Sequence, residues 1–202
     1  MIGIIDYNVG NLRSLGRALE RLDVPYGWVR LPEELATYNK IILPGVGAFK
    51  PAIDQLTQKG FPNALKEALS SGTVTLLGIC LGMQLLYNSS TEGGEAKGLG
   101  LINGTVERLP RRLGYRVPHI GWRHINHLPQ SQLFRELPDA PVFYFAHSYF
   151  CKTYDSLSVL GQANYGSLID IAIESNNVFG VQFHPEKSQR VGLKVLENFS
   201  NL

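Results

Sequence analysis

The chain has 202 residues, of which 44% are hydrophobic and 18% are charged, and its formal net charge is +2. That length suits one well-buried domain, which we expect to span residues 1–202, and the small net charge gives no reason to expect binding to nucleic acid or an anionic membrane. No apolar run is long enough to span a bilayer, and the chain does not start with a basic and then apolar signal peptide.

Up to about residue 98, strand-like and helix-like segments alternate. Asn11 can cap the first helix, which has apolar residues on one face. The predicted strands are residues 1–6, 26–29, 40–43 and 73–79, and the predicted helices are residues 11–22, 51–58, 62–71 and 81–87. The strand 73–79 is almost wholly apolar, as in a parallel strand buried on both faces. This alternation predicts an α/β fold, an open and mostly parallel twisted sheet with helices on both faces.

The second half of the chain has a different pattern, in which short β-like pieces are separated by Gly, Pro and Asn turns. We expect these pieces to add strands in the C-terminal half, at residues 104–109, 142–145, 157–163, 170–173 and 178–183. A last helix is predicted over residues 191–199. The stretch that carries His119, His124 and His127 resembles a loop without cysteines, so we expect no metal site there.

The strongest local signal is Gly78-Ile79-Cys80-Leu81-Gly82, at the turn from the buried strand 73–79 to a helix. A nucleophile between glycines at such a turn is the nucleophile-elbow arrangement, with cysteine in place of serine. The helix start favours the thiolate, and the backbone N–H of Leu81 can hold a developing oxyanion. The alternative is a buried apolar cysteine beside glycines used for packing.

Cys151 is the only other cysteine, and it lies in a β-like stretch without elbow glycines. We assign it a structural role. Two cysteines so far apart predict neither a disulfide framework nor a metal-ligand motif, so we expect reduced thiols and a cytoplasmic protein.

A second signal is Phe183-His184-Pro185-Glu186, directly after the apolar segment 178–183. Residues two apart in an extended chain face the same way, so His184 and Glu186 can converge. A cysteine nucleophile needs a base, and the base needs a group that fixes its tautomer. The alternative is a histidine and a glutamate that end a strand in solvent.

A third signal is the glycine-flanked loop of Gly45, Val46 and Gly47, between a predicted strand and a predicted helix. Such a loop presents backbone N–H groups to an anion. It can bind phosphate or supply a second oxyanion donor opposite Leu81. It lacks the lysine of a phosphate loop and does not match the dinucleotide fingerprint.

Together and in this order, the three signals resemble the class I glutamine amidotransferases, over nearly the whole chain. The resemblance implies a Cys-His-Glu triad on an α/β sheet, with Cys80 as nucleophile, His184 as general base and Glu186 as its orienting partner. It implies an oxyanion hole made by Gly45, Val46, Gly47 and Leu81, glutamine as the substrate, and no cofactor or metal.

Further motifs resemble those glutaminase subunits that pass ammonia to a (β/α)8-barrel cyclase in histidine biosynthesis. The motifs are Gly10-Asn11-Leu12, Cys80 to Leu86, Lys97 to Gly100, His119 to Trp122, Tyr144 to Tyr149 and Phe183 to Ser188. The resemblance implies a heterodimer with that cyclase.

The resemblance also implies roles for residues outside the triad. Gln84, Glu92 and the backbone of His147, Ser148 and Tyr149 would contact glutamine, and Asn11, Trp122, Tyr144 and Lys187 would face the partner. The alternatives are an exposed helix position for Gln84, a solvated loop carboxylate for Glu92 and core packing for Trp122.

Four residues depart from the usual subfamily pattern, and none belongs to the triad: Asn8, Ile120, Arg123 and Ala146. These departures put the identity of the partner in question, rather than the chemistry of the triad. The first alternative is a paralogous glutaminase subunit that supplies a sugar amidotransferase of surface-polysaccharide synthesis. A stand-alone cysteine hydrolase or a non-catalytic scaffold are further alternatives.

Overall fold

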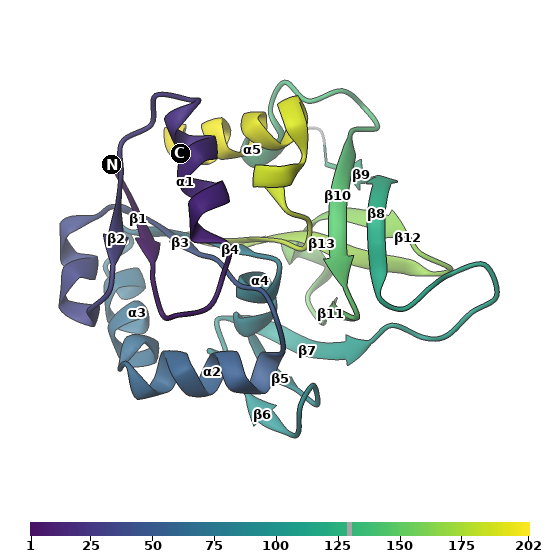
Figure 1. Ribbon diagram of the computed structural model, residues 1–202, viewed down its shortest axis with the longest axis horizontal. Helices are drawn as coiled ribbons and strands as arrows, with labels where there is room; N and C mark the ends of the chain where they lie inside the picture. The colour runs from purple at the N-terminus through teal and green to yellow at the C-terminus, as the bar shows by residue number, and fades with distance from the viewer. Residues whose placement is uncertain (129–130) are drawn as a thin grey trace.

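A computed structural model describes residues 1–128 and 131–202 (Figure 1). Its centre is a mixed 12-stranded sheet, and a two-stranded sheet lies beside it. The helices are α1 (Leu12–Glu20), α2 (Phe49–Gln58), α3 (Phe61–Ser70), α4 (Leu81–Leu85) and α5 (Gln189–Asn201). In the part of the chain that is described, no helix is both long and apolar enough to cross a membrane.

One half of the large sheet is parallel, in the order β2-β1-β3-β4-β14. Its strands are β1 (Ile2–Ile5), β2 (Tyr26–Val29), β3 (Lys40–Leu43), β4 (Thr75–Ile79) and β14 (Val178–Val181). β4 and β14 pair in register, with Ile79 opposite Val181. The segments that follow these two strands therefore leave the sheet at the same edge, although they are far apart in the sequence.

The other half of the sheet is largely antiparallel and continues from β14 in the order β13-β11-β7-β5-β6. Its strands are β13 (Leu168–Ser175), β11 (Tyr149–Thr153), β7 (Ile102–Arg108), β5 (Tyr87–Ser90) and β6 (Ala96–Lys97). Off this path, β12 (Val159–Asn164) pairs with β13, and β9 (Asn126–His127) pairs with β12. The small sheet pairs β8 (His119–His124) with β10 (Val142–His147). Short 3-10 helices occupy Pro32–Thr37, Gln132–Phe134, Ser156–Ser158 and Pro185–Lys187.

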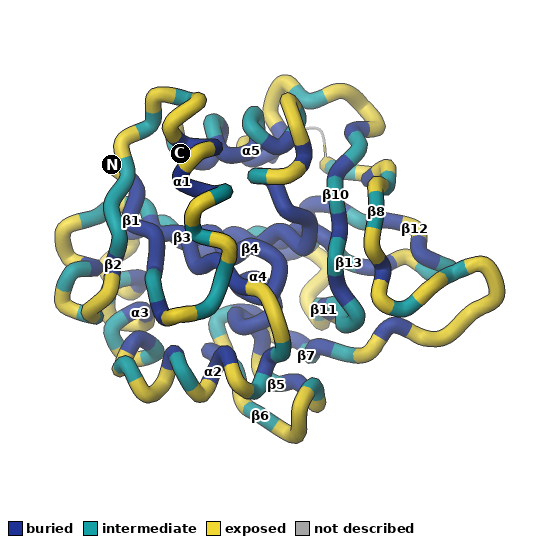
Figure 2. The backbone as a smooth tube through the Cα atoms, in the orientation of Figure 1, coloured by how far each residue is buried: buried dark blue, intermediate teal, exposed yellow. Residues whose placement is uncertain are grey.

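Each face of the sheet has its own core. Buried residues of α1 and α5, such as Leu19 and Phe199, pack with Ile4 and Leu77 on one face. Buried residues of α2 and α3 pack on the other face, in a cluster that contains Ile41. Figure 1 shows α1 and α5 on one side of the parallel strands and α2 and α3 on the other, and Figure 2 shows the strands between them as buried. The structure thus has the predicted α/β architecture, with helices on both faces.

Local details of the sequence explain the first turn and helix. Asn8 adopts a left-handed backbone conformation with a φ of 67°, which asparagine tolerates. The side chain of Asn11 accepts a hydrogen bond from the backbone N–H of Ser14 and so caps α1, as predicted. The predicted elements otherwise correspond to observed ones, with ends that differ by a few residues.

The loop predicted around His119 to His127 was wrong, because residues 119–124 form β8 and residues 126–127 form β9. Along β8 a polar residue is buried and apolar residues are exposed, the reverse of an ordinary half-buried strand. His119 is buried, whereas Ile120 and Trp122 are exposed. Sequence patterns identify strands by their buried apolar positions, so this strand gives no signal.

Candidate active site

Cys80 lies at a sharp turn between β4 and α4. Its φ of 54° and ψ of −109° are strained for a residue with a side chain. The backbone N–H of Cys80 donates to the carbonyl of Val181 at 2.8 Å, which ties the turn to β14. The side chain is buried, with 5% of the residue exposed. This is the predicted elbow rather than a cysteine in a regular strand.

The two flanking glycines are needed because other backbone passes where their side chains would be. A Cβ on Gly82 would collide with the carbonyl oxygen of Leu43 at the end of β3, and a Cβ on Gly78 would lie 2.8 Å from backbone atoms of Gly82. The start of α4 therefore packs against backbone on both sides, and it presents its first N–H groups beside Cys80.

His184 and Glu186 follow β14 and meet as expected. Nδ1 of His184 lies 2.9 Å from Oε1 of Glu186, and both side chains are at most 5% exposed. Burial alone would lower the pKa of His184, but hydrogen bonds to Cys80 and Glu186, together with their charges, raise it above its usual range. With Nδ1 held by the carboxylate, Nε2 is the nitrogen left for the sulfur. The buried, hydrogen-bonded pair therefore excludes the solvent-exposed alternative, and the raised pKa favours the imidazolium form of His184.

The loop of Gly45, Val46 and Gly47 lies directly against the elbow. A Cβ on Gly45 would lie 2.9 Å from the backbone nitrogen of Gly82, and Gly47 has a φ of 104°. The buried hydroxyl of Tyr7 donates to the carbonyl of Pro44 at 2.8 Å and holds the start of the loop. A cavity of only 10 Å³ is lined by Gly45 and Val46 of this loop together with His184 and Glu186. The oxyanion roles of the loop and of Leu81 stay predictions.

Gln84 is 3% exposed, so it is not the exposed helix residue of the alternative interpretation. Its Nε2 donates to the carbonyl of Tyr149 at 2.9 Å and to Oε1 of Gln182 at 3.0 Å. Both of its N–H groups are therefore used within the protein. Only the Oε1 atom of Gln84 remains to contact a substrate, and it can only accept a hydrogen bond.

Glu92 is half-buried rather than fully solvated. Its Oε2 accepts a hydrogen bond of 3.0 Å from the backbone N–H of Phe49, so it caps α2 in place of the preceding Ala48. Burial raises the pKa of this carboxyl, and the bond from Phe49 opposes that shift. One carboxylate oxygen is thus already engaged, and the contact with substrate stays a prediction.

His147, Ser148 and Tyr149 connect β10 to β11. Nδ1 of His147 lies 2.8 Å from the carbonyl of Tyr149, and its Nε2 lies 3.0 Å from Nδ1 of His119. Burial lowers the pKa of His147 to about 4 and that of His119 to about 3, so both rings are neutral at physiological pH. The carbonyl of Ser148 accepts from the N–H of Leu109 at 2.9 Å. These bonds hold the strip of backbone rigidly beside Gln84.

The predicted partner-facing residues form a surface group around Tyr144. Trp122 is 46% exposed, which argues against core packing, and it contacts Tyr144 edge to face with ring centroids 5.7 Å apart. Nζ of Lys187 lies 5.7 Å from the centre of the Tyr144 ring. Asn11 lines the same small cavity as His184. Their role in binding a partner stays a prediction.

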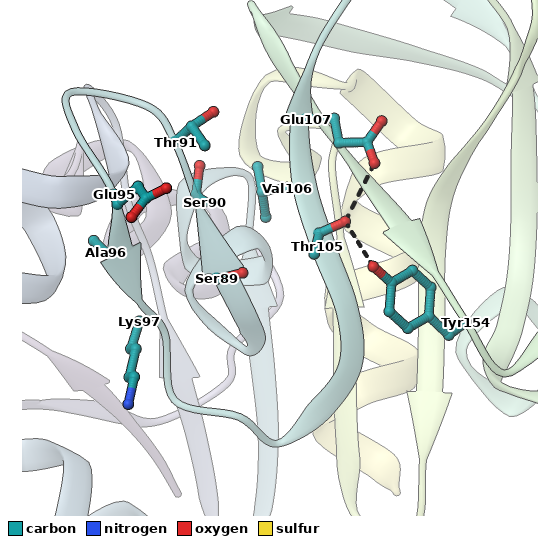
Figure 3. A pocket seen from close by; sticks show the side chains of 10 residues that line it. All are labelled: Ser89, Ser90, Thr91, Glu95, Ala96, Lys97, Thr105, Val106, Glu107 and Tyr154. Carbon is teal, nitrogen blue, oxygen red and sulfur yellow. Dashed lines mark hydrogen bonds between the residues drawn. The ribbon is translucent and has the colours of Figure 1, made fainter.

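A much larger cavity lies elsewhere, on the β5, β6 and β7 edge of the sheet (Figure 3). Its volume is 680 Å³, and its lining includes Ser89, Glu95, Lys97 and Glu107. Cys80, His184 and Glu186 are not among its lining residues. Its size therefore does not identify the reactive centre, whose position follows from the strained cysteine and its partners.

Two buried polar residues of this region were missed in the sequence. Gln182 is fully buried with its Nε2 3.7 Å from Sγ of Cys80, and His119, which the sequence offers as a competing base, a metal ligand or part of a subfamily motif, is instead a buried partner of His147. A polar residue inside the apolar run 178–183 was the available signal for Gln182. His124 and His127 lie apart from the triad and bond to the carbonyls of Ala140 and Pro138.

Comparison with known proteins agrees with this geometry. The family described as glutamine amidotransferase class-I matches residues 3–201. The chain belongs to the class I glutamine amidotransferases. Solved amidotransferases share the fold. A crystal structure of a glutamine amidotransferase covers 100% of the chain and 99% of its own length, with a TM-score of 0.76 at 22% identity. The PurLQS structure from Thermotoga maritima gives the same TM-score and identity, covering 99% of this amidotransferase and 97% of that chain.

Relatives of higher identity include subunits of imidazole glycerol phosphate synthase. The imidazole glycerol phosphate synthase subunit HisH of Moorella thermoacetica is 47% identical over 201 residues, which cover 100% of the chain and 94% of the relative. Subunit HisH 1 of Campylobacter jejuni strain 81-176 is 41% identical over the full length of both chains.

Proposed function

We propose that this amidotransferase is the glutaminase subunit of an imidazole glycerol phosphate synthase, and that it delivers ammonia to a (β/α)8-barrel cyclase subunit. The observation that carries the proposal is the buried Cys80-His184-Glu186 constellation at a strained elbow. The full-length similarity to subunits of that synthase supports the choice of pathway.

The chemistry follows from these three side chains. The Cys80 thiolate attacks the side-chain carbonyl carbon of glutamine and forms a tetrahedral intermediate. The His184 imidazolium transfers its proton to the departing nitrogen, which leaves as ammonia, and a glutamyl thioester remains. Neutral His184 then takes a proton from water, which attacks the thioester and releases glutamate and the thiolate. Glu186 keeps the ring oriented and stabilises the imidazolium in both half-reactions.

Stabilisation of the oxyanion is assigned to the loop of Gly45, Val46 and Gly47 and to the N–H of Leu81. A preorganised donor of this kind contributes about 3 kcal/mol to the barrier reduction. The loop's contact with the start of α4 supports the assignment. The free Oε1 of Gln84, the carboxylate of Glu92 and the strip from His147 to Tyr149 would hold the glutamine backbone groups.

Ammonia must leave this site without becoming protonated in water, which requires a partner that receives it. The exposed group of Trp122, Tyr144 and Lys187, with Asn11 near the triad, is the surface assigned to that partner. A subunit with no acceptor site of its own is expected to be slow alone and to be stimulated by the loaded partner.

The test is glutamate release from glutamine by the purified chain, alone and with a barrel cyclase and its nucleotide substrate. We expect at least a hundredfold rise with the loaded cyclase, which corresponds to a barrier lowered by about 2.7 kcal/mol. Cys80→Ala is the control and should release no glutamate.

Other outcomes separate the alternatives. Activity that needs Cys80 but ignores the cyclase would contradict the histidine-pathway partner and favour a sugar-amidating acceptor. Full activity of the chain alone, with no preference for glutamine, would favour a stand-alone hydrolase. No activity in any mixture would favour a scaffold.

A further inference from the structure

Gln182 is a buried carboxamide that contacts the nucleophile. It is fully buried, and its Nε2 lies 3.7 Å from Sγ of Cys80, within hydrogen-bond distance for sulfur. Its backbone N–H donates to the carbonyl of Ile171 at 2.8 Å, so the residue is held in the sheet. A buried amide is costly unless its donors and acceptors are bonded, and here one of its partners is the reactive atom.

The orientation of this carboxamide follows from a chain of bonds rather than from its shape, because the two ends of an amide have nearly the same shape. The carbonyl of Tyr149 can only accept, so the nitrogen of Gln84 must face it, at 2.9 Å. The same nitrogen lies 3.0 Å from the side chain of Gln182, which must therefore present its oxygen. The nitrogen of Gln182 is then the end that faces Cys80.

The positions of the protons at the other end of this series of hydrogen bonds are determined in the same way. The carbonyl of Tyr149 also accepts from Nδ1 of His147, which places the proton of that neutral ring on Nδ1. Nε2 of His147 is then an acceptor, and it faces Nδ1 of His119 at 3.0 Å. The carbonyl of Tyr149 thus accepts from both sides: from the His119–His147 pair on one side, and on the other from Gln84, which also donates to Gln182 and so directs the N–H of Gln182 to the sulfur.

We propose that Gln182 is a catalytic residue of the amide hydrolysis, whose side-chain N–H donates to the Cys80 sulfur and favours its anionic form. This inference rests on the proposed glutaminase function and adds a donor to the triad. A hydrogen bond to an anion is stronger than one to a neutral group, so the contact favours thiolate over thiol. The same N–H stabilises the sulfur when it leaves the thioester.

Gln84 and His147 are then positioning residues. Gln84 fixes which end of Gln182 faces the sulfur, and the carbonyl of Tyr149 fixes Gln84. His147 holds that carbonyl from its other side.

The test is the pH dependence of Cys80 alkylation by iodoacetamide, followed by mass spectrometry of the Cys80 peptide in the full chain. Only the thiolate reacts, so the pH of half-maximal reaction reports how well the anion is stabilised. In Gln182→Leu the donor is lost, and in Gln182→Glu a carboxylate faces the sulfur while the bond from Gln84 is kept. We expect the midpoint to rise by about one pH unit in Gln182→Leu and further in Gln182→Glu, which means about tenfold less thiolate at a given pH.

The matched control is Gln162→Leu on β12, whose carboxamide bonds to Asp170 away from the site and whose loss should leave the midpoint unchanged. Cys80→Ala identifies any labelling of the buried Cys151. An unchanged midpoint in the folded Gln182 variants overturns the inference. Where Gln182→Leu does not fold, the result for Gln182→Glu decides the question. Because alkylation needs neither glutamine nor a partner, failure of the proposed function appears separately, as absence of glutamate release by the unmodified chain.

Discussion

At the scale of single residues, the reactive centre depends on groups whose ordinary properties are altered by burial. His184 would lose its proton readily if it were buried without partners, but Glu186 and the sulfur keep it charged. The protonated form of His184 is the one that the proposed mechanism needs to expel ammonia. Glu186 is therefore, together with Cys80, one of the two partners that raise the pKa of His184.

Glu186→Gln should keep the geometry and remove that charge. The pKa of His184 then falls, because the imidazolium loses its main buried counter-ion besides the thiolate, and a neutral amide no longer selects the correct tautomer. We expect kcat to fall by about 10³-fold or more, with little change in KM, in a steady-state glutaminase assay. Glu174→Gln, a half-buried glutamate on β13, is the matched control and should keep its activity. Equal losses in the two variants would argue against a specific role for Glu186.

At the scale of elements, the site exists because β4, β14, β3 and α4 meet at one edge of the sheet. Parallel pairing of β4 with β14 places Cys80 beside the segment of His184, and α4 can begin so close to β3 only because Gly82 has no side chain. The elbow is thus held by backbone packed on backbone, which cannot adjust as a flexible side chain can.

Gly82→Ala tests this packing. The added methyl group would meet the carbonyl of Leu43, so we expect the free energy of unfolding to fall by about 3 kcal/mol in a urea titration. Gly72→Ala is the control, because a Cβ there meets no atom within 4 Å and costs only the strain of a φ of 72°. That strain should cost about 1 kcal/mol. A loss no greater in Gly82→Ala than in Gly72→Ala would contradict the steric account.

At the scale of the whole molecule, the pH dependence of stability should reflect the buried pair of His119 and His147. The pKa values of about 3 and about 4 lie below the value of about 6.5 in an unfolded chain. Below pH 6.5 the unfolded chain therefore binds protons that the folded chain does not. The contribution of these two neutral rings to the free energy of unfolding is therefore fully present above pH 6.5 and is lost as the pH falls towards 4. The pKa of His184 is raised rather than lowered, so its effect on the free energy of unfolding has the opposite sign and occurs above pH 6.5. It therefore does not mask the effect of the two rings.

We expect the free energy of unfolding to fall by up to about 1.4 kcal/mol per pH unit for each of the two rings between pH 6.5 and 5. His119→Gln should reduce that slope by about half in urea titrations at a series of pH values. His124→Gln, at an exposed histidine, should leave the slope unchanged. A slope that is the same in all three proteins would show that the pair is not responsible.

Much of the architecture was predictable because its signals are local. The turn at Cys80 is encoded by the glycines beside it and the apolar run before it, and the approach of His184 to Glu186 is encoded by their spacing around Pro185. The start of α1 is likewise encoded by Asn11. Such features depend on near neighbours in the chain, so periodicity and turn chemistry are enough to find them.

The sequence by itself therefore determined the alternation of strands and helices, and it singled out Cys80, His184 and Glu186, which the structure brings together and whose catalytic roles stay a prediction. Only the tertiary structure decided that Gln84 is buried and that Gln182 contacts Cys80. It also decided that β8 is a strand whose buried position is His119 and whose exposed position is Trp122. These contacts join residues far apart in the chain, and their burial depends on which strands become neighbours. Since no local pattern records that choice, packing of the whole sheet is what brings Gln182 to the sulfur and Gln84 to Gln182.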